Sequence, residues 1–255
     1  MCGRYTSTST TASLASMFSV DEVDVDEGPP RFNVAPTQGV RAVAERGKAE
    51  RDRPCRQLGN YRWGLVPSCA KDPSIGARLI NARAEGIATK NVYRTALARR
   101  RCIIAADAFY EWQLRPGAAK ARKLPYLICH RDRSPLAFAG LWDTCHDDKD
   151  PVGVLASCVI ITTEANTVVA PIHTPMPVVL PAASWDSWLD RGNDDVHQLQ
   201  ALLVPARAED FEVYPVSTAV GNVANDNPEL VDPRPPQPPV SAEAGQRSLF
   251  PVEDR

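Results

Sequence analysis

Short apolar runs separated by turn-rich stretches are the main pattern along the chain. Runs of this length, rich in branched and aromatic residues and bounded by Pro, Gly, Asn or Asp, predict β-strands. We expect strands at residues 40–43, 61–67, 102–106, 126–129, 136–141, 154–161, 178–180 and 211–216, with a strand-like start at Cys2. The run at 102–106 is apolar at every position, which is typical of a buried strand.

Apolar positions three or four residues apart predict a few short helices. Ser9 or Thr10 is a suitable N-cap for the first of them, which places Leu14, Met17 and Phe18 on one face. The other helices are expected at residues 92–98, 182–189 and 196–203. Charged or polar stretches at 46–56 and before residue 79 predict loops, and prolines bracket another loop at 171–177.

This order of elements favours an α+β fold with a mainly antiparallel or mixed sheet, because hairpin-like turns outnumber crossover helices. The 255 residues are enough for a large core, and we expect one domain over residues 1–225. Residues 226–255 are rich in proline and poor in large apolar groups, which predicts a disordered tail.

Composition and charge exclude several classes of protein. The net charge is −2, so nucleic acid is a partner only if basic groups gather on one face. The seven cysteines are an odd number without a CxxC pair, which argues against a disulfide framework and a clustered zinc site. The sequence has no secretory signal and no run of about 18 apolar residues. We expect a cytoplasmic monomer without metal, cofactor or membrane contact.

Cys2 is the residue with the most distinctive chemistry. Removal of Met1, which a small second residue permits, leaves a cysteine with a free α-amine and a thiol on adjacent carbons. Their ordinary pKa values, about 8 for the amine and about 8.5 for the thiol, leave reactive fractions at neutral pH. Such an aminothiol condenses with an aldehyde and closes a thiazolidine ring. The alternative is that cysteine stands at position 2 by chance.

Eight motifs decide between these interpretations, because they occur together in the order of a known family. They are Cys2-Gly3-Arg4-Tyr5, Phe32-Asn33-Val34-Ala35-Pro36-Thr37, Trp63-Gly64-Leu65-Val66-Pro67, Ile80-Asn81-Ala82-Arg83-Ala84-Glu85, Arg101-Cys102-Ile103-Ile104, Phe109-Tyr110-Glu111-Trp112, Ile172-His173 and Val220-Gly221-Asn222. The set resembles the SRAP family of SOS-response-associated peptidases, now understood as abasic-site-processing proteins, over roughly residues 2–225. The resemblance implies a barrel-like sheet with flanking helices.

The resemblance also implies a function and a set of site residues. Family members use the N-terminal cysteine to capture the aldehyde of an abasic site in single-stranded DNA as a thiazolidine crosslink. They are credited with autoproteolytic release of the preceding residue, and a lyase activity is compatible with this chemistry. By this resemblance Cys2 supplies amine and thiol, Asn81 orients the N-terminus or the sugar, Glu111 moves protons, and His173 assists ring opening.

Two arginines, Arg4 and Arg83, match family arginines that hold phosphates beside the lesion. DNA binding would make the cytoplasmic protein nucleoid-associated. Guanidinium is suited to this role because it grips phosphate bidentately.

Each of these residues also has a structural interpretation. Glu111 could be a strand-end acid paired with an arginine, His173 a structural histidine, Asn81 a turn residue, and the two arginines surface charges. For the basic run at residues 99–101 we expect a solvated helix end. Trp63 and Trp112 are expected in the core.

The sequence departs from the family pattern at two positions. Cys69 stands where relatives usually carry a tryptophan that wedges against the bases, and Pro175 where they usually carry an arginine. Stacking on a base contributes about 1–3 kcal/mol. We therefore expect the crosslinking chemistry to persist with weaker DNA binding.

Three other functions are compatible with parts of this pattern. A glutamine amidotransferase with an N-terminal nucleophile also matures to Cys-Gly, but its Asn-Gly and Gly-Asp elements are absent here. A thiol peptidase acting on other proteins could use Cys2, His173 and Glu111. A non-catalytic binder of single strands would explain the two departures.

Overall fold

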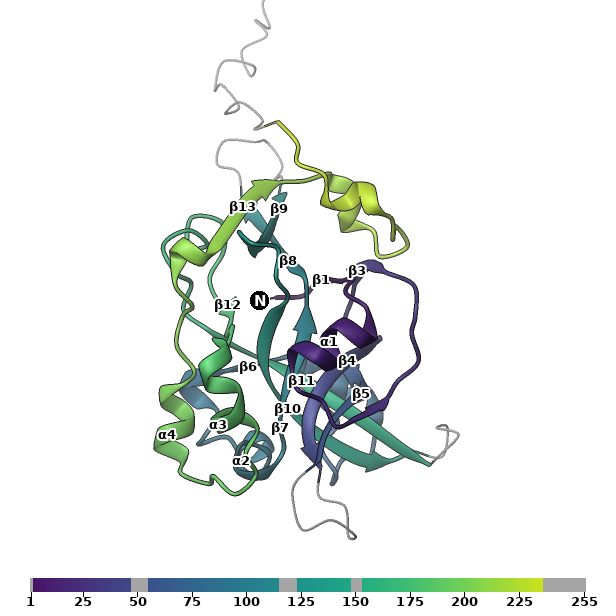
Figure 1. Ribbon diagram of the computed structural model, residues 1–255, viewed down its shortest axis with the longest axis vertical. Helices are drawn as coiled ribbons and strands as arrows, with labels where there is room; N and C mark the ends of the chain where they lie inside the picture. The colour runs from purple at the N-terminus through teal and green to yellow at the C-terminus, as the bar shows by residue number, and fades with distance from the viewer. Residues whose placement is uncertain (1, 47–54, 115–122, 148–152, 236–255) are drawn as a thin grey trace, which may run out of the picture.

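The computed structural model describes residues 2–46, 55–114, 123–147 and 153–235. In these ranges the chain forms two β-sheets with a few short helices, so the predicted α+β class with a mainly antiparallel or mixed sheet is confirmed (Figure 1). The strands are β1 (Tyr5–Ser7), β2 (Glu22–Asp24), β3 (Arg31–Val34), β4 (Gly39–Arg46), β5 (Cys55–Trp63), β6 (Asn81–Arg83), β7 (Arg101–Ala106), β8 (Ala108–Leu114), β9 (Lys123–His130), β10 (Leu136–His146), β11 (Val154–Thr163), β12 (Met176–Pro177) and β13 (Phe211–Pro215).

Four α-helices and several single 3-10 turns connect the strands in the described ranges. The α-helices are α1 (Thr11–Met17), α2 (Asn91–Arg99), α3 (Trp185–Leu189) and α4 (Val196–Ala201). The 3-10 turns are η1 (Pro73–Arg78), η2 (Ala84–Gly86), η3 (Ala182–Ser184), η4 (Ala208–Asp210), η5 (Thr218–Gly221) and η6 (Pro228–Val231). Thr10 caps α1 by accepting a hydrogen bond from the Ser13 amide, as expected.

The larger sheet closes into a five-stranded barrel. Its strands follow the order β11-β10-β7-β4-β5, and a parallel pairing of β11 with β5 completes the ring. The residues of β7 are all buried, because this strand lies at the centre of the sheet between β10 and β4. The predicted barrel-like sheet is therefore confirmed, and β6 adds to it beside β11.

The smaller sheet holds the N-terminal strand in its interior. Its order is β13-β9-β8-β1-β3, so β1 pairs with β8 on one side and β3 on the other. Tyr5 anchors the strand against the barrel: its ring centroid lies 5.3 Å from that of Trp63 and 6.0 Å from that of Phe138. Such tilted aromatic pairs stabilise packing beyond the area that they bury. The N-terminal segment is thereby fixed on both edges and one face.

The helices pack over a cluster of buried apolar residues on the barrel strands. Leu14 and Phe18 of the α1 region, Leu97 of α2, Trp188 of α3 and Leu199 of α4 are all buried there. Figure 1 shows α2, α3 and α4 grouped on one side of the sheets. The predicted flanking helices are confirmed, although α3 is a short helix that follows η3.

Most predicted strands are confirmed, several of them longer than expected, but one ends early and another lies at a different position. The run at 61–67 forms a strand only to Trp63, because Gly64 adopts a φ of +128° and leaves the sheet. The strand expected at 178–180 lies instead at β12, and Val179 keeps only an isolated bridge to Phe138. Residues 47–54 of the loop expected at 46–56 lie outside the described residues, whereas its ends belong to the paired strands β4 and β5.

One alternative interpretation and one expectation are wrong at individual residues. Glu111 does not end a strand; it lies within β8, a strand that follows β7 after a single residue and that we did not predict separately. Arg101 is not solvated; it is 2% exposed and donates hydrogen bonds to five backbone carbonyls, those of Leu97, Ala98, Trp188, Asp190 and Asn193. Because α2 and the α3 region present these carbonyls together, the guanidinium replaces water there.

The chain remains packed beyond the expected domain boundary at residue 225. Leu230 of η6 is 2% exposed, and the Arg234 amide donates a hydrogen bond to the Pro215 carbonyl over 2.8 Å. The start of the expected tail is therefore held against the smaller sheet. Residues 236–255 of that tail lie outside the described residues.

Gly64 gives a stability prediction. Gly64→Ala is expected to lower the free energy of unfolding by at least about 2 kcal/mol, because φ is +128° and the new Cβ would lie 2.4 Å from the Gly76 carbonyl oxygen. Urea unfolding measures the change. Gly221→Ala is the control, since its Cβ meets nothing within 4 Å. Unchanged stability of Gly64→Ala would contradict this account of the turn.

Candidate active site

Cys2 lies shortly before β1 of the smaller sheet and is fully buried, with 0% of its surface exposed. The side-chain amide of Asn81 donates a hydrogen bond to the Cys2 carbonyl over 2.8 Å. Asn81 is itself fixed by the sheet, because β6 pairs in parallel with β11 and places Asn81 opposite Ile160. The predicted orienting residue therefore does contact the N-terminal segment, across 79 positions of sequence.

The side-chain oxygen of Asn81 differs from the side-chain nitrogen in its contacts. Its Oδ1 is buried and has no hydrogen-bond partner among the described residues. A buried carbonyl oxygen without a donor is unfavourable by about 1–3 kcal/mol. A donor that reaches this oxygen, such as an amine or a sugar hydroxyl, is therefore favoured at this place.

Glu111 lies on β8, the strand that pairs with β1, and is 2% exposed. Burial raises the pKa of its carboxyl group to about 7, because the ionised form loses solvation. Its Oε1 is buried without a hydrogen-bond partner among the described residues. A carboxyl group in this state can both give and accept a proton near neutral pH.

The electrostatics of Cys2 and Glu111 are linked. Burial raises the pKa of the Cys2 thiol, and the nearby Glu111 charge raises it further. The thiol is therefore neutral at physiological pH, in contrast to the thiolate of a cysteine nucleophile, whose pKa is lowered by cationic neighbours.

His173 faces the same carboxyl group from the loop between β11 and β12. Its Nε2 lies 3.9 Å from Glu111 Oε2, which is too long for a hydrogen bond. Partial burial lowers the pKa of the imidazole, so we assign a neutral histidine rather than an ion pair. Gln113, two residues after Glu111 on β8, donates a hydrogen bond to the Pro171 carbonyl over 3.0 Å and ties this loop to the strand.

Arg4 and Arg83 differ in their surroundings. Arg4 is half-buried: its Nη1 donates to Asn33 Oδ1 over 2.8 Å and to the Val220 carbonyl over 2.9 Å. Arg83 is exposed and forms a surface pair with Glu85, with 3.3 Å between Nε and Oε2. Such surface pairs contribute little, so Arg83 can exchange Glu85 for another anion at small cost. The backbone of Arg4 forms a hydrogen bond with the Cys2 thiol, which lowers the thiol pKa but does not offset the effect of burial.

Three residues near the site were not predicted to have a role there: Asn33 and Trp112, which belong to the sequence motifs, and Gln113, which follows Trp112. Asn33 is 1% exposed and bonds to Arg4, Trp112 lies with its ring centroid 5.9 Å from the Arg4 guanidinium carbon, and Gln113 holds the His173 loop. Trp63 is buried as expected, whereas Trp112 is only partly buried. A buried asparagine one strand away from an arginine gives no local sequence signal of this contact.

The two departures from the family pattern lie at different kinds of position. Cys69 is exposed in the loop after β5, and Pro175 precedes β12. None of the seven cysteines, all of which lie within the described ranges, forms a disulfide bond. Within the described ranges, no group of three or more His, Cys, Asp or Glu side chains could hold a metal ion, and no helix is long and apolar enough to cross a membrane.

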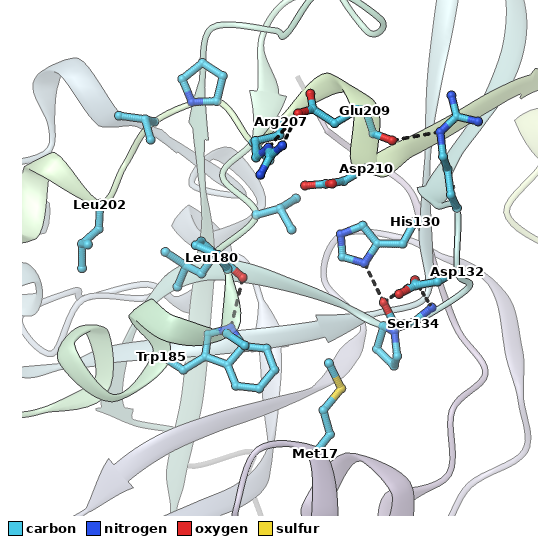
Figure 2. Close-up of a pocket in the computed structure, with 18 residues that line it drawn as sticks. Met17, His130, Asp132, Ser134, Leu180, Trp185, Leu202, Arg207, Glu209 and Asp210 are labelled. Atoms are coloured by element: carbon cyan, nitrogen blue, oxygen red, sulfur yellow. Dashed lines mark hydrogen bonds and ion pairs between the residues drawn. The ribbon is translucent and has the colours of Figure 1, made fainter.

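The larger of two described cavities, about 570 Å³, lies away from these residues. Figure 2 shows residues of its lining, with the apolar Leu180, Trp185 and Leu202 on one side and the polar His130 and Ser134 on the other. Ser134 Oγ donates to Asp132 and lies 3.0 Å from His130 Nδ1. In a catalytic triad the carboxylate contacts the histidine, which in turn contacts the serine. Here Asp132 contacts Ser134 instead of His130, so these three residues do not form such a triad.

Comparisons with known proteins found similar sequences over most of the chain. The family model described as SOS response associated peptidase (SRAP) matches residues 1–223. The abasic site processing protein YoqW of Bacillus subtilis is 39% identical over 234 residues, which cover 91% of this chain and 99% of that protein. The abasic site processing protein HMCES of Gallus gallus is 32% identical over 229 residues, covering 80% of this chain and 66% of its own.

A solved structure supports the fold. A protein from Bacteroides thetaiotaomicron superposes with a TM-score of 0.76 at 21% identity, covering 91% of this chain and 100% of that chain. At this level of identity the likeness concerns the fold alone.

The buried carboxyl group of Glu111 gives a pH prediction. Because its pKa is raised to about 7 in the folded protein, its unfavourable contribution is absent at acidic pH and grows as pH rises from about 4.5 to 7. Glu111→Gln should therefore gain stability relative to the wild type by about 2–3 kcal/mol between pH 5 and pH 8. Urea unfolding at both pH values measures this difference, and an equal difference at both would contradict the raised pKa.

Proposed function

The chain belongs to the SOS response associated peptidase family, and we propose that it captures abasic sites in single-stranded DNA as a covalent thiazolidine at Cys2. The names of its relatives support abasic-site processing as the general role. The observation that carries the covalent step is the burial of Cys2 within electrostatic reach of Glu111, with Asn81 bonded to its backbone.

The reaction follows from the groups present. After Met1 is removed, the unprotonated α-amine of Cys2 adds to the sugar aldehyde carbon and gives a carbinolamine. Loss of water from this adduct gives an imine, and Glu111 in its acid form protonates the departing hydroxyl. The imine is still protonated on nitrogen when the thiol sulfur adds to its carbon, and the thiol proton passes to the Glu111 carboxylate, which regenerates the acid. One water leaves overall, and no oxidant or cofactor is consumed.

The charge states favour this order of steps. The thiol is neutral, because burial and Glu111 raise its pKa, so the amine is the group that attacks first. Once Glu111 has given its proton, the carboxylate can accept the thiol proton. His173, held neutral by its lowered pKa, can move a proton to or from the ring oxygen while the sugar opens.

We also propose that the same groups support the release of Met1. A lyase activity is a side reaction of the imine. The protein acts as a monomer on DNA in the nucleoid. Arg4 and Arg83 would hold backbone phosphates next to the lesion. Cys2, Asn81, Glu111 and His173 form the reacting centre of this proposal.

The peptidase alternative is less well supported by these charges. A thiol protease requires a thiolate, usually stabilised by a nearby imidazolium. Here the pKa of the Cys2 thiol is raised and that of His173 is lowered, which opposes such an ion pair. Hydrolysis of casein by the purified protein would restore this alternative.

Cys2→Ser separates the two bonds of the thiazolidine. The variant keeps the α-amine and should form the imine, but its hydroxyl closes the ring poorly. We expect no heat-stable adduct with abasic single strands on a denaturing gel, and an adduct only when borohydride reduces the imine. The wild type should crosslink without reductant. A heat-stable adduct of Cys2→Ser without reductant would contradict thiazolidine formation.

Cys69 gives a prediction about affinity. Cys69→Trp should tighten binding to abasic single strands about 10- to 100-fold, because an exposed indole at this position can stack on a base. A fluorescence titration measures the change, with Cys69→Leu as a control for apolar area without an aromatic ring. A wild-type affinity already equal to that of a relative with tryptophan would count against the expected weakening.

A further inference from the structure

Among the residues that the structure describes, Asn33 is the one buried polar side chain that joins the Arg4 guanidinium to a segment more than 180 residues away. Its Oδ1 accepts from Arg4 Nη1 over 2.8 Å. Its Nδ2 lies within donating distance of three carbonyls of that segment, those of Val220 at 3.3 Å, Asn222 at 3.0 Å and Asn225 at 2.7 Å. With 1% of its surface exposed, the side chain cannot exchange these partners for water.

The same carbonyl of Val220 also accepts from Arg4 Nη1, over 2.9 Å. Arg4, Asn33 and the turn η5 therefore form a closed set of hydrogen bonds. A second tie holds this set in place, because Asp226 Oδ1 accepts from the Phe32 amide over 2.5 Å. The segment at 220–226 is thus bonded to both residues 32 and 33 of β3.

The orientation of the guanidinium follows from these contacts. Both of these hydrogen bonds use Nη1, and the group lies over the Trp112 ring at 5.9 Å. Nε is buried and has no hydrogen-bond partner among the described residues. Nη2 is therefore the nitrogen left to bind an external acceptor. An arginine fixed at one nitrogen loses little side-chain entropy when the other binds phosphate.

We propose that Asn33 is a positioning residue for DNA binding, which holds Arg4 against the segment at 220–225 so that its remaining nitrogen meets a backbone phosphate. The inference rests on the proposed function, since that function supplies the DNA. The motifs around Asn33 and Val220 then share one role, because together they support a single phosphate contact beside Cys2.

Single-stranded DNA carrying tetrahydrofuran, an abasic analogue without an aldehyde, is the probe that tests this proposal. Binding to this probe is non-covalent, so it remains measurable even if the crosslinking chemistry of the proposed function fails. Asn33→Ala should weaken affinity roughly tenfold, and should lower the slope of log affinity against log salt by about 0.7, the value for one phosphate contact on a single strand.

Tyr110→Phe is the matched control. It removes one hydrogen bond to the same strand, from the Tyr110 hydroxyl to the Phe32 carbonyl over 2.8 Å, and leaves the hydrogen bonds of Arg4 to Asn33 and Val220 in place. Tyr110→Phe should lose about as much thermal stability as Asn33→Ala. Its slope of log affinity against log salt should stay the same as in the wild type. An equal change of slope in both variants would show that loosening β3 is sufficient, and would overturn the proposal.

A double-mutant cycle tests whether Asn33 acts through Arg4. In the Arg4→Ala background, Asn33→Ala should have no further effect on affinity or slope. If Asn33→Ala weakens binding equally in both backgrounds, the proposal is wrong.

Arg4→Lys tests the same point without changing Asn33, in case that variant does not fold. A lysine ammonium cannot contact Asn33 and a phosphate in the same fixed geometry, so its loss of affinity should approach that of Arg4→Ala. Retention of most of the affinity by Arg4→Lys would mean that charge alone is needed, which would also overturn the proposal.

Discussion

Burial of the N-terminal strand is the constraint on which the rest of the site depends. A chain terminus is normally exposed, but here β1 lies between β8 and β3, and the Tyr5 ring packs against Trp63 and Phe138 of the barrel. Cys2 is drawn into the core with it and is fully buried. The smaller sheet and the barrel are thus both needed. The smaller sheet supplies the strands on either side of β1, and the barrel supplies the surface beneath it.

The chemistry of the site follows from this burial. In a medium of low dielectric constant, the charged forms of Cys2 and Glu111 are disfavoured, so the pKa of the thiol rises and that of the carboxyl group reaches about 7. A neutral thiol and a half-protonated acid suit a condensation in which the amine reacts first. The cations lie farther out: Arg83 is exposed, and Arg4 is held by Asn33 at the rim. Of the proposed site residues, Cys2 and Glu111 are therefore buried, whereas Arg83, the proposed phosphate ligand, is exposed.

Much of the fold could be predicted from the sequence because its signals are local. The continuous apolar run of β7 and the capped helix α1 are determined by neighbouring residues, and both were predicted at nearly the correct bounds. The positions that were missed depend on distant partners. Trp63 ends its strand because Gly64 turns against Gly76, Arg101 is buried because two helical regions present carbonyls to it, and Asn33 holds Arg4 through a segment at 220–225. The candidate site was predicted from family motifs, and composition alone gave none of its contacts.

The most direct measurement of the central claim is mass spectrometry of the N-terminal peptide after reaction with an abasic single strand, nuclease digestion and alkylation of free thiols. Our account predicts that the peptide begins with Cys2, carries the sugar phosphate with the loss of one water, and resists alkylation because both amine and sulfur are bonded to the sugar carbon. An adduct on another residue, on a chain that retains Met1, or with an alkylated Cys2 thiol would contradict it.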